Sequence, residues 1–326
     1  MSGFKTAATV VSAPAAETEE FDAQLAARIC WHYFKESRTQ EEVAQRLGLT
    51  RKRVNQMIGL ALATGLVQIS IDGRFGPYLE LEARLVERYR LRRAVVVPSP
   101  APETDVRSVV GAAAGQYVSD TLAAGETLAI AWGGTIHAAA QNLHRRQSGN
   151  TIVSLVGGLV ASGPINPYDN AAMFARFLGA DCRYVTAPMI ADTAELRDAL
   201  MASRHIRETL ATVRGADRAL LSAVDLTEQS KALEYGVISR ATWRSLRAAG
   251  AVGDIAGHYL DADGHPIDHP ITRQVIHADL ADLRSVREIV LAAGGAHKAP
   301  IIRAGLKAEL GHVLITDEAA AVELLK

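Results

Sequence analysis

The sequence predicts an α/β protein in which a small helical part precedes a larger part built on a mostly parallel sheet. In residues 21–65, apolar side chains recur every three or four positions, which is the spacing of helices that bury one face. Beyond residue 93, short apolar runs alternate with helical patterns, as in parallel sheets covered by helices. With 326 residues, 48% hydrophobic and 22% charged, the chain has the length of about two globular domains.

The start of the chain is expected to carry no targeting signal. Residues 1–20 contain only Lys5 as a basic residue and lack a sustained apolar centre, so we expect a disordered tail and not a signal peptide. No apolar run approaches the roughly 20 residues that span a bilayer. Cys30 and Cys182 lie far apart, which argues against a disulfide framework and a structural zinc site. We expect a cytoplasmic protein without membrane association, metal or cofactor.

The helical part is expected to begin with a helix over residues 21–34. A second helix starts near Gln40, because Thr39 and Glu42 have the spacing of a capping box, in which side chains and backbone amides exchange hydrogen bonds. Gly48 ends this helix, since glycine readily adopts the positive φ of a helix stop. The spacing therefore predicts two short helices joined by a tight turn.

A third helix follows, capped by Thr50 and opening with consecutive cations. Val54, Met57, Ile58 and Leu62 recur at helical spacing and are expected to point inward. Arginine, asparagine and glutamine match the edges of guanine and adenine, whereas lysine more often contacts phosphate. The pattern predicts a helix-turn-helix motif whose third helix enters the major groove, with its first arginine, its asparagine and its glutamine nearest the bases. The expected DNA-binding residues are Thr39, Thr50, Arg51, Lys52, Arg53, Asn55 and Gln56.

Adjacent cations can also be nothing more than a solvated helix end, which is their usual meaning on a protein surface. The caps, the glycine turn and the strand-and-turn pattern of residues 69–73 favour DNA binding and predict a winged helix-turn-helix domain over residues 21–75. Phe75 and Tyr78 are expected to pack this wing or to touch a DNA sugar. The net charge of −1 hides an excess of Lys and Arg in residues 28–53, where attraction to nucleic acid would reside.

Residues 76–93 have the pattern of an amphipathic helix with apolar positions at Leu79, Leu81, Leu85 and Val86. Such a helix could link the two domains or pair with its counterpart in a dimer. The sequence leaves both roles open.

The larger domain is expected over residues 94–326. Because ligands of parallel α/β sheets bind beyond the carboxyl ends of the strands, the loops that follow the strands are the candidate binding elements. The predicted strands are residues 94–97, 127–132, 151–156, 183–187, 218–223 and 313–316.

Two glycine-rich loops follow predicted strands. In the first, Gly133 and Gly134 would let the backbone approach a ligand, and Thr135 adds a hydroxyl where helix amides can bind an anion. The second begins with Gly157 and Gly158. Glycine also serves simple turn geometry, and that alternative stays open for both loops. Asn166, Asp169 and Asn170 in the second loop could bond hydroxyl groups, although turn formation and helix capping are their ordinary roles.

Two later segments complete the candidate site. Asp254, in Val-Gly-Asp-Ile, can accept hydrogen bonds from sugar hydroxyls, and Lys298, in Gly-Gly-Ala-His-Lys, can pair with phosphate or donate to a hydroxyl. An ordinary surface lysine is the alternative for Lys298. Four nearby histidines lack a fixed ligand spacing, so we expect no metal site; they are His258, His265, His269 and His277.

The helix-turn-helix pattern followed by Trp-Gly-Gly-Thr, Val-Gly-Asp-Ile and Gly-Gly-x-x-Lys resembles the SorC family of sugar-responsive bacterial transcriptional regulators. The resemblance covers nearly the whole chain after residue 20. It implies a Rossmann-like effector domain with the fold of sugar-phosphate isomerases and glucosamine-phosphate deaminases, used for sensing. It also implies operator DNA as a partner and a homodimer or homotetramer.

The resemblance also assigns roles to residues. Gly133, Gly134 and Thr135 would hold the phosphate or terminal hydroxyl end of an effector together with Lys298, and Asp254 would face its hydroxyls. Where family members often have a second hydroxyl residue, this chain has Ile136, which disfavours a phosphate and suggests a small polyol, with an erythritol-type regulator as a close relative.

Three functions remain open from the sequence. We expect a transcriptional regulator, most simply a repressor, of a carbohydrate or polyol catabolic operon. A sugar-phosphate isomerase or deaminase is the second, with Asp254 or Asp169 as a general base. A module that binds another protein through its basic helix is the third.

Overall fold

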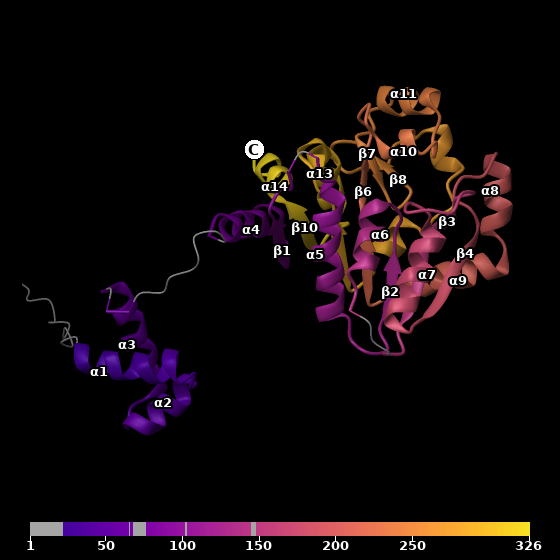
Figure 1. Cartoon of the computed structure of the whole chain (residues 1–326). Helices are drawn as coiled ribbons and strands as arrows, with labels where there is room; N and C mark the ends of the chain where they lie inside the picture. The colour runs from indigo at the N-terminus through magenta and orange to yellow at the C-terminus, as the bar shows by residue number, and fades with distance from the viewer. Residues whose placement is uncertain (1–21, 65, 68–75, 102, 145–147) are drawn as a thin grey trace, which may run out of the picture. The chain divides into compact units, whose positions relative to one another are not determined.

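The computed structural model describes residues 22–64, 66–67, 76–101, 103–144 and 148–326. The chain forms two compact units, residues 1–72 and 73–326 (Figure 1). The predicted tail, the predicted hairpin at residues 69–73 and Phe75 lie outside the described residues.

Unit 1 is a small helical bundle. Its core is closed by fully buried side chains from three helices, among them Ile29, Val43, Val54 and Met57. Leu62 was expected to point inward but is 40% exposed. Ala61, two helical turns after Val54, takes the inward position instead. The elements of unit 1 are α1 (Ala23–Cys30), a π-helical turn (Trp31–Lys35), α2 (Gln40–Leu47) and α3 (Arg51–Ala63).

Unit 2 is built on a seven-stranded sheet in which every pair of neighbouring strands is parallel. The strands follow the order β1-β10-β9-β5-β2-β3-β4, so their carboxyl ends meet at one edge of the sheet. Their bounds are β1 (Arg93–Val97), β2 (Thr127–Ile130), β3 (Thr151–Gly158), β4 (Asp181–Pro188), β5 (Arg218–Leu221), β9 (Glu288–Ala292) and β10 (Val313–Asp317).

Helices cover both faces of this sheet (Figure 1). Alternation along β2 shows why: Leu128 and Ile130 pack against one helical layer, whereas Ala129 packs into the core on the other side. The first layer contains α5 (Val106–Thr121), α6 (Gly134–Gln141) and α7 (Pro167–Leu178). The second contains α4 (Gly76–Tyr89), α8 (Ala194–Met201), α9 (Arg204–Arg214), α12 (Leu280–Arg284), α13 (Ala299–Lys307) and α14 (Glu318–Leu324).

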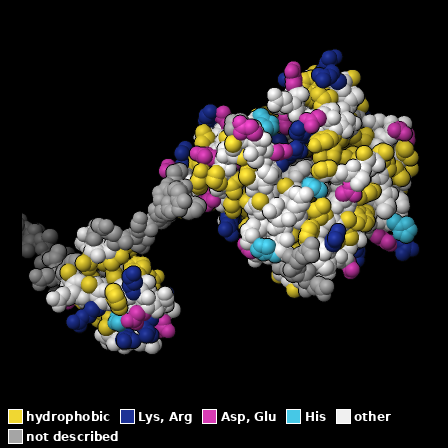
Figure 2. Space-filling view, in the orientation of Figure 1, with side chains coloured by type: hydrophobic (Ala, Val, Ile, Leu, Met, Phe, Trp, Pro, Cys, Tyr) yellow, Lys and Arg dark blue, Asp and Glu magenta, His cyan; other side chains and the backbone are white. Residues whose placement is uncertain are grey.

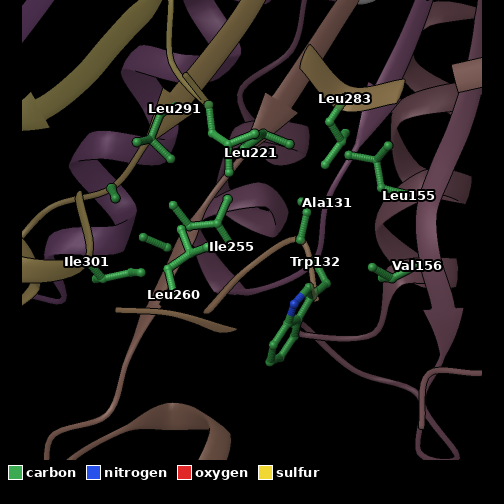
Figure 3. Packing of buried hydrophobic residues seen from close by; sticks show 14 of the residues in the cluster. Ala131, Trp132, Leu155, Val156, Leu221, Ile255, Leu260, Leu283, Leu291 and Ile301 are labelled. Carbon is green, nitrogen blue, oxygen red and sulfur yellow. The ribbon is translucent and has the colours of Figure 1, made fainter. Parts of the chain in front are cut away.

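A second, antiparallel sheet lies beyond the carboxyl end of β5. It consists of β6 (Ala223–Asp225), β7 (Gly253–Ile255) and β8 (His258–Leu260). Ile255 and Leu260 belong to the same hydrophobic core as Leu221 and Trp132 (Figure 3). The short helices α10 (Lys231–Glu234) and α11 (Arg240–Ala248) connect β6 to β7.

The predicted linker helix α4 packs within unit 2. Leu85 is fully buried, the Tyr89 hydroxyl donates to the Leu324 carbonyl at 2.7 Å, and Glu82 accepts from the Val96 amide at 2.8 Å. Tyr78 lies in α4 and packs against the core of unit 2; the wing that it was expected to contact lies outside the described residues, so that contact stays a prediction. In the described part of the chain, no helix combines the length and apolarity needed to cross a membrane.

Candidate DNA-binding helix and effector site

The caps predicted for α2 and α3 are formed. The Thr39 amide donates to Glu42 at 2.7 Å and the Glu42 amide donates to the Thr39 hydroxyl at 3.3 Å, while Gly48 ends α2 with φ 66°. The Thr50 hydroxyl accepts from the Arg53 amide at 3.2 Å and starts α3. These bonds fix where the helix-turn-helix motif bends.

One face of α3 is exposed and polar. Arg51, Lys52, Asn55 and Gln56 are exposed, and Arg53 is half-buried. Arg53 donates to the Gln56 side chain at 3.3 Å. The arrangement presents the predicted DNA-binding residues of α3 to solvent on the face opposite its buried apolar side chains.

In unit 2, the first glycine loop forms the start of α6. Gly133 has φ 113°, a conformation that side-chain-bearing residues rarely adopt, and it caps α6 without a side-chain hydrogen bond. A Cβ atom on Gly134 would lie 2.5 Å from Nη1 of Arg107, so this guanidinium group lies against the backbone at the helix start. Thr135, the residue after Gly134, is buried. The two glycines thus make room for side chains of the chain itself, and the predicted approach of a ligand to their backbone stays a prediction.

Arg107 and Lys298 meet in a cavity of about 360 Å³ at the carboxyl edge of the sheet, named the cationic cavity below. Arg107 Nε donates to Asp105 Oδ2 at 2.7 Å, and this bond lowers the pKa of the Asp105 carboxyl. Lys298 is buried and donates to the Ala223 carbonyl at 3.0 Å; burial lowers the pKa of its ammonium group. The lining residues are Asp105, Val106, Arg107, Asp225, Gln229, Lys231, Glu234, His297 and Lys298.

Asp254 lies on β7 and is buried. One carboxyl oxygen accepts from the Trp132 indole N–H at 3.2 Å, while the other has no hydrogen-bond partner of ordinary geometry among the described residues. Burial raises the pKa of Asp254 to about 7, against the lowering effect of the Trp132 and Gly257 N–H groups. Figure 3 shows the Trp132 ring projecting beside the buried core.

Asn170, on α7, contacts the first glycine loop through hydrogen bonds. It is fully buried, and its amide bonds the Gly133 carbonyl at 3.4 Å and the His137 ring at 3.2 Å. These contacts tie α7 to the start of α6. Asn170 therefore positions the loop against which Arg107 lies.

Asn166 and Asp169 fold the second glycine loop. The Asn166 side chain caps α7 and donates to the carbonyls of Leu159 at 2.9 Å and Ala161 at 2.8 Å. Asp169 accepts from the Gly163 amide at 2.6 Å and the Ser162 hydroxyl at 2.7 Å. These are the turn-forming roles that the sequence left open for both residues.

Gly157 and Gly158 are required for packing space. A Cβ atom on Gly157 would lie 2.4 Å from the Pro188 carbonyl oxygen, and one on Gly158 would lie 2.3 Å from the Tyr168 ring. Gly158 also lines a second cavity of about 400 Å³, formed by residues 158–165, 188–190 and 235–237. We name it the apolar cavity.

Sequence reasoning missed Arg107, Asp105, Lys231 and His297. The available signal was position: Asp105 and Arg107 follow β1, whose carboxyl end lies at the same edge as the two glycine loops. Among the described residues, no group of three or more His, Cys, Asp or Glu could hold a metal. His258 and His277 instead pack with ring centroids 4.0 Å apart and bond the Ala278 carbonyl.

Comparison with known proteins connects both units to regulators. Residues 74–326 match the family described as "Putative sugar-binding domain". The chain is 30% identical over 308 residues to transcriptional regulator LsrR of Klebsiella pneumoniae, covering 93% of each protein. It is 31% identical over 307 residues to the erythritol catabolism regulatory protein EryD of Brucella abortus, covering 93% of this chain and 97% of EryD. The crystal structure of the full-length sorbitol operon regulator SorC from Klebsiella pneumoniae shares the fold, with a TM-score of 0.72 and 23% sequence identity. The match covers 93% of this chain and 99% of the SorC chain.

These similarities confirm the α/β fold class and the regulatory function expected from the sequence. The curated relatives are named as regulators, so the isomerase or deaminase alternative is set aside, and the protein is a transcriptional regulator and not an enzyme. Such a regulator acts on DNA and responds to a sugar-type effector through its larger domain. The chain belongs to the SorC-type family of transcriptional regulators with a sugar-binding domain.

Proposed function

We propose that the protein represses a carbohydrate or polyol catabolic operon, and that an effector bound at the carboxyl edge of the unit 2 sheet changes its affinity for the operator. The observation that carries this proposal is the cationic cavity, which is lined by Arg107 and Lys298, with Arg107 lying against Gly134 at the start of α6. A repressor needs such a site to sense its inducer. A homodimer or homotetramer would place two recognition helices on successive turns of a palindromic operator.

The cationic cavity favours an effector with a phosphate group. The start of a helix carries partial positive charge, and Arg107, Lys231 and Lys298 line the cavity beside it. Arg107 is paired with Asp105, so an incoming anion would share this guanidinium group with that carboxylate. Ile136 does not weaken this inference, because it is fully buried in the core between α6 and the sheet, and a hydroxyl in that position would not face the cavity. A sugar phosphate or polyol phosphate therefore fits better than a free polyol.

A free polyol is the second candidate. It is favoured by the similarity to EryD, which is named for erythritol catabolism. Asp254, with one unpaired carboxyl oxygen, is the residue we propose to accept from hydroxyl groups of either effector.

Thermal unfolding against erythritol, pentose phosphates and hexose phosphates separates these candidates. A ligand at about 100 times its dissociation constant adds roughly 2.7 kcal/mol to the free energy of unfolding. We expect stabilisation by a phosphate compound that is lost in Arg107→Ala and kept in the control Arg204→Ala, whose side chain is 80% exposed on α9. Stabilisation by erythritol that survives Arg107→Ala would establish the polyol candidate instead.

Recognition of the operator is assigned to α3. We propose that Arg51, Asn55 and Gln56 contact bases, and that Lys52 contacts phosphate. Arg51→Ala should cost about 1 to 3 kcal/mol and relax preference at one base position, whereas Lys52→Ala should weaken binding to all sequences and reduce the salt dependence by about one unit. Gel shifts at several salt concentrations measure both effects. Unchanged operator affinity in Arg51→Ala would reject this assignment and leave the solvated helix end as its explanation.

A further inference from the structure

The apolar cavity lies at the same edge of the sheet as the cationic cavity. Its volume of about 400 Å³ is within the usual range for small-molecule pockets. On the face shown in Figure 2, hydrophobic side chains gather near the positions of α10 and β3 in Figure 1, beside a group of Lys and Arg side chains near β6. The hydrophobic lining includes Leu159, Ile165, Pro188, Met189, Ile190 and Val237.

The loop that forms one wall of the apolar cavity bonds its one side-chain hydroxyl and several of its backbone groups internally. The Asn166 side chain donates to the carbonyls of Leu159 and Ala161. Asp169 accepts hydrogen bonds from the Gly163 amide and from Ser162, which has the only side-chain hydroxyl of that wall. The Gly158 carbonyl accepts from the Met189 amide at 2.7 Å. A ligand hydroxyl placed here would exchange hydrogen bonds with water for apolar contacts, which is unfavourable. This wall therefore suits a part of a ligand that has few hydroxyls.

One continuous segment lines both cavities. Gln229, Lys231 and Glu234 line the cationic cavity, and the next three residues, 235–237, line the apolar cavity. Tyr235 also interacts with the guanidinium group of Arg107. The two cavities are therefore neighbours, separated by the end of α10.

We propose that the effector spans both cavities, with its anionic group near Arg107 and Lys298 and a deoxygenated or alkyl-bearing part in the apolar cavity. This inference rests on the proposed function and narrows its effector to anionic carbohydrate derivatives that lack hydroxyls at the end remote from the anion. A fully hydroxylated sugar phosphate fills the cationic cavity but gains little from the apolar one.

Calorimetric titration of the full chain with inorganic phosphate and with n-alkyl phosphates from ethyl to octyl tests the proposal. The phosphate group reports on the cationic cavity, and the alkyl chain reports on its neighbour. Once the alkyl chain of the ligand extends past Tyr235, each further methylene group that it buries should tighten binding about fourfold, the factor that corresponds to ~0.8 kcal/mol. The length at which this gain begins measures the distance between the two cavities.

Leu159→Ser and Val237→Ser should abolish the gain with chain length and leave binding of inorganic phosphate unchanged. The matched control is Leu196→Ser, because Leu196 is 43% exposed on α8 and lines neither cavity. Thermal unfolding of each variant without ligand verifies that it is folded.

The outcomes separate the two proposals. Phosphate binding whose affinity does not depend on chain length would overturn the two-cavity effector and leave the anionic site intact. A gain with chain length that survives both Leu159→Ser and Val237→Ser would also overturn it, since the alkyl group would bind elsewhere. Absence of binding by every phosphate would reject the anionic site of the proposed function itself.

Discussion

The two edges of the unit 2 sheet differ in what surrounds their charged side chains. At the amino edge, Arg218 pairs with Glu126 at 3.0 Å and with Glu288, and Arg287 also pairs with Glu126, so cations and carboxylates from neighbouring strands neutralise one another. At the carboxyl edge, Arg107 pairs with Asp105 beside the positive end of α6, whereas buried Lys298 donates to a backbone carbonyl. The ion pairs of the amino edge stabilise the fold, whereas Arg107 and Lys298 line a cavity that we propose to bind a ligand.

This contrast predicts its largest effect at Asp254, a carboxyl near the carboxyl edge that forms no salt bridge with another of the described residues. Its pKa is raised to about 7 in the folded protein, above roughly 3.9 in the unfolded chain. The folded state therefore holds the proton more tightly, and the stability contributed by this group is lost as pH rises from about 4 through 7. The loss is about 1.4 kcal/mol per pH unit, or up to about 4 kcal/mol over that window.

Asp254→Asn isolates this effect, because the amide keeps an acceptor for the Trp132 indole but does not ionise. Urea unfolding of both proteins at pH 5 and pH 8 should show the wild type losing stability relative to the variant. His258 and His277 act in the opposite direction in both proteins, since burial lowers their pKa values and favours folding as pH rises. Parallel pH profiles would show that Asp254 is not a buried unpaired acid.

The amino edge should respond next most strongly. Arg218→Ala leaves Glu126 and Glu288, whose side chains are only 14% and 18% exposed, without their shared cation. Removing one partner of a largely buried pair costs about 3 kcal/mol, whereas exposed pairs contribute about 0 to 1 kcal/mol. Urea unfolding measures the loss, with Arg204→Ala as the exposed control. A loss of effector binding in Arg218→Ala, with stability retained, would reverse the roles that we assign to the two edges.

The length of each strand largely decided whether the sequence could predict it. Runs such as Thr151–Gly158 are long enough to show an apolar strand, and all six predicted strands are present. The three-residue strands β6, β7 and β8 were missed, because so few residues show no clear period. The five-residue β9 was missed although its apolar run is as long as those of β1 and β10, which were predicted. The predicted run 218–223 is divided at Ser222, whose hydroxyl bonds the Trp132 carbonyl at 2.6 Å.

Site residues were harder to predict than strands. Glycine loops and Lys298 have local signatures, whereas the position of Arg107 depends on α5 and α6 packing closely in space, which no local pattern encodes. A Cβ atom on Gly111 of α5 would lie 2.4 Å from Ala138 of α6, so this close packing depends on glycine. The contacts of Asn166, Asp169 and Asn170 likewise depend on how loops and helices pack in space. The sequence therefore could not decide whether these side chains face a ligand or hold a loop.

The smallest predicted effect tests the carboxyl edge alone. In Gly134→Ala, the new methyl group would lie 2.5 Å from Arg107 Nη1, so the guanidinium group must move away from the start of α6. The φ of Gly134 is not positive, and alanine favours helices by about 1 kcal/mol over glycine, so stability should change by no more than about 1 kcal/mol. Phosphate binding should weaken about tenfold, which corresponds to about 1.4 kcal/mol. Gly215→Ala is the control, since the nearest atom to its Cβ would be 4.0 Å away. Calorimetric titration with inorganic phosphate gives both values, and equal affinity in the two variants would mean that Arg107 binds no anion in this position.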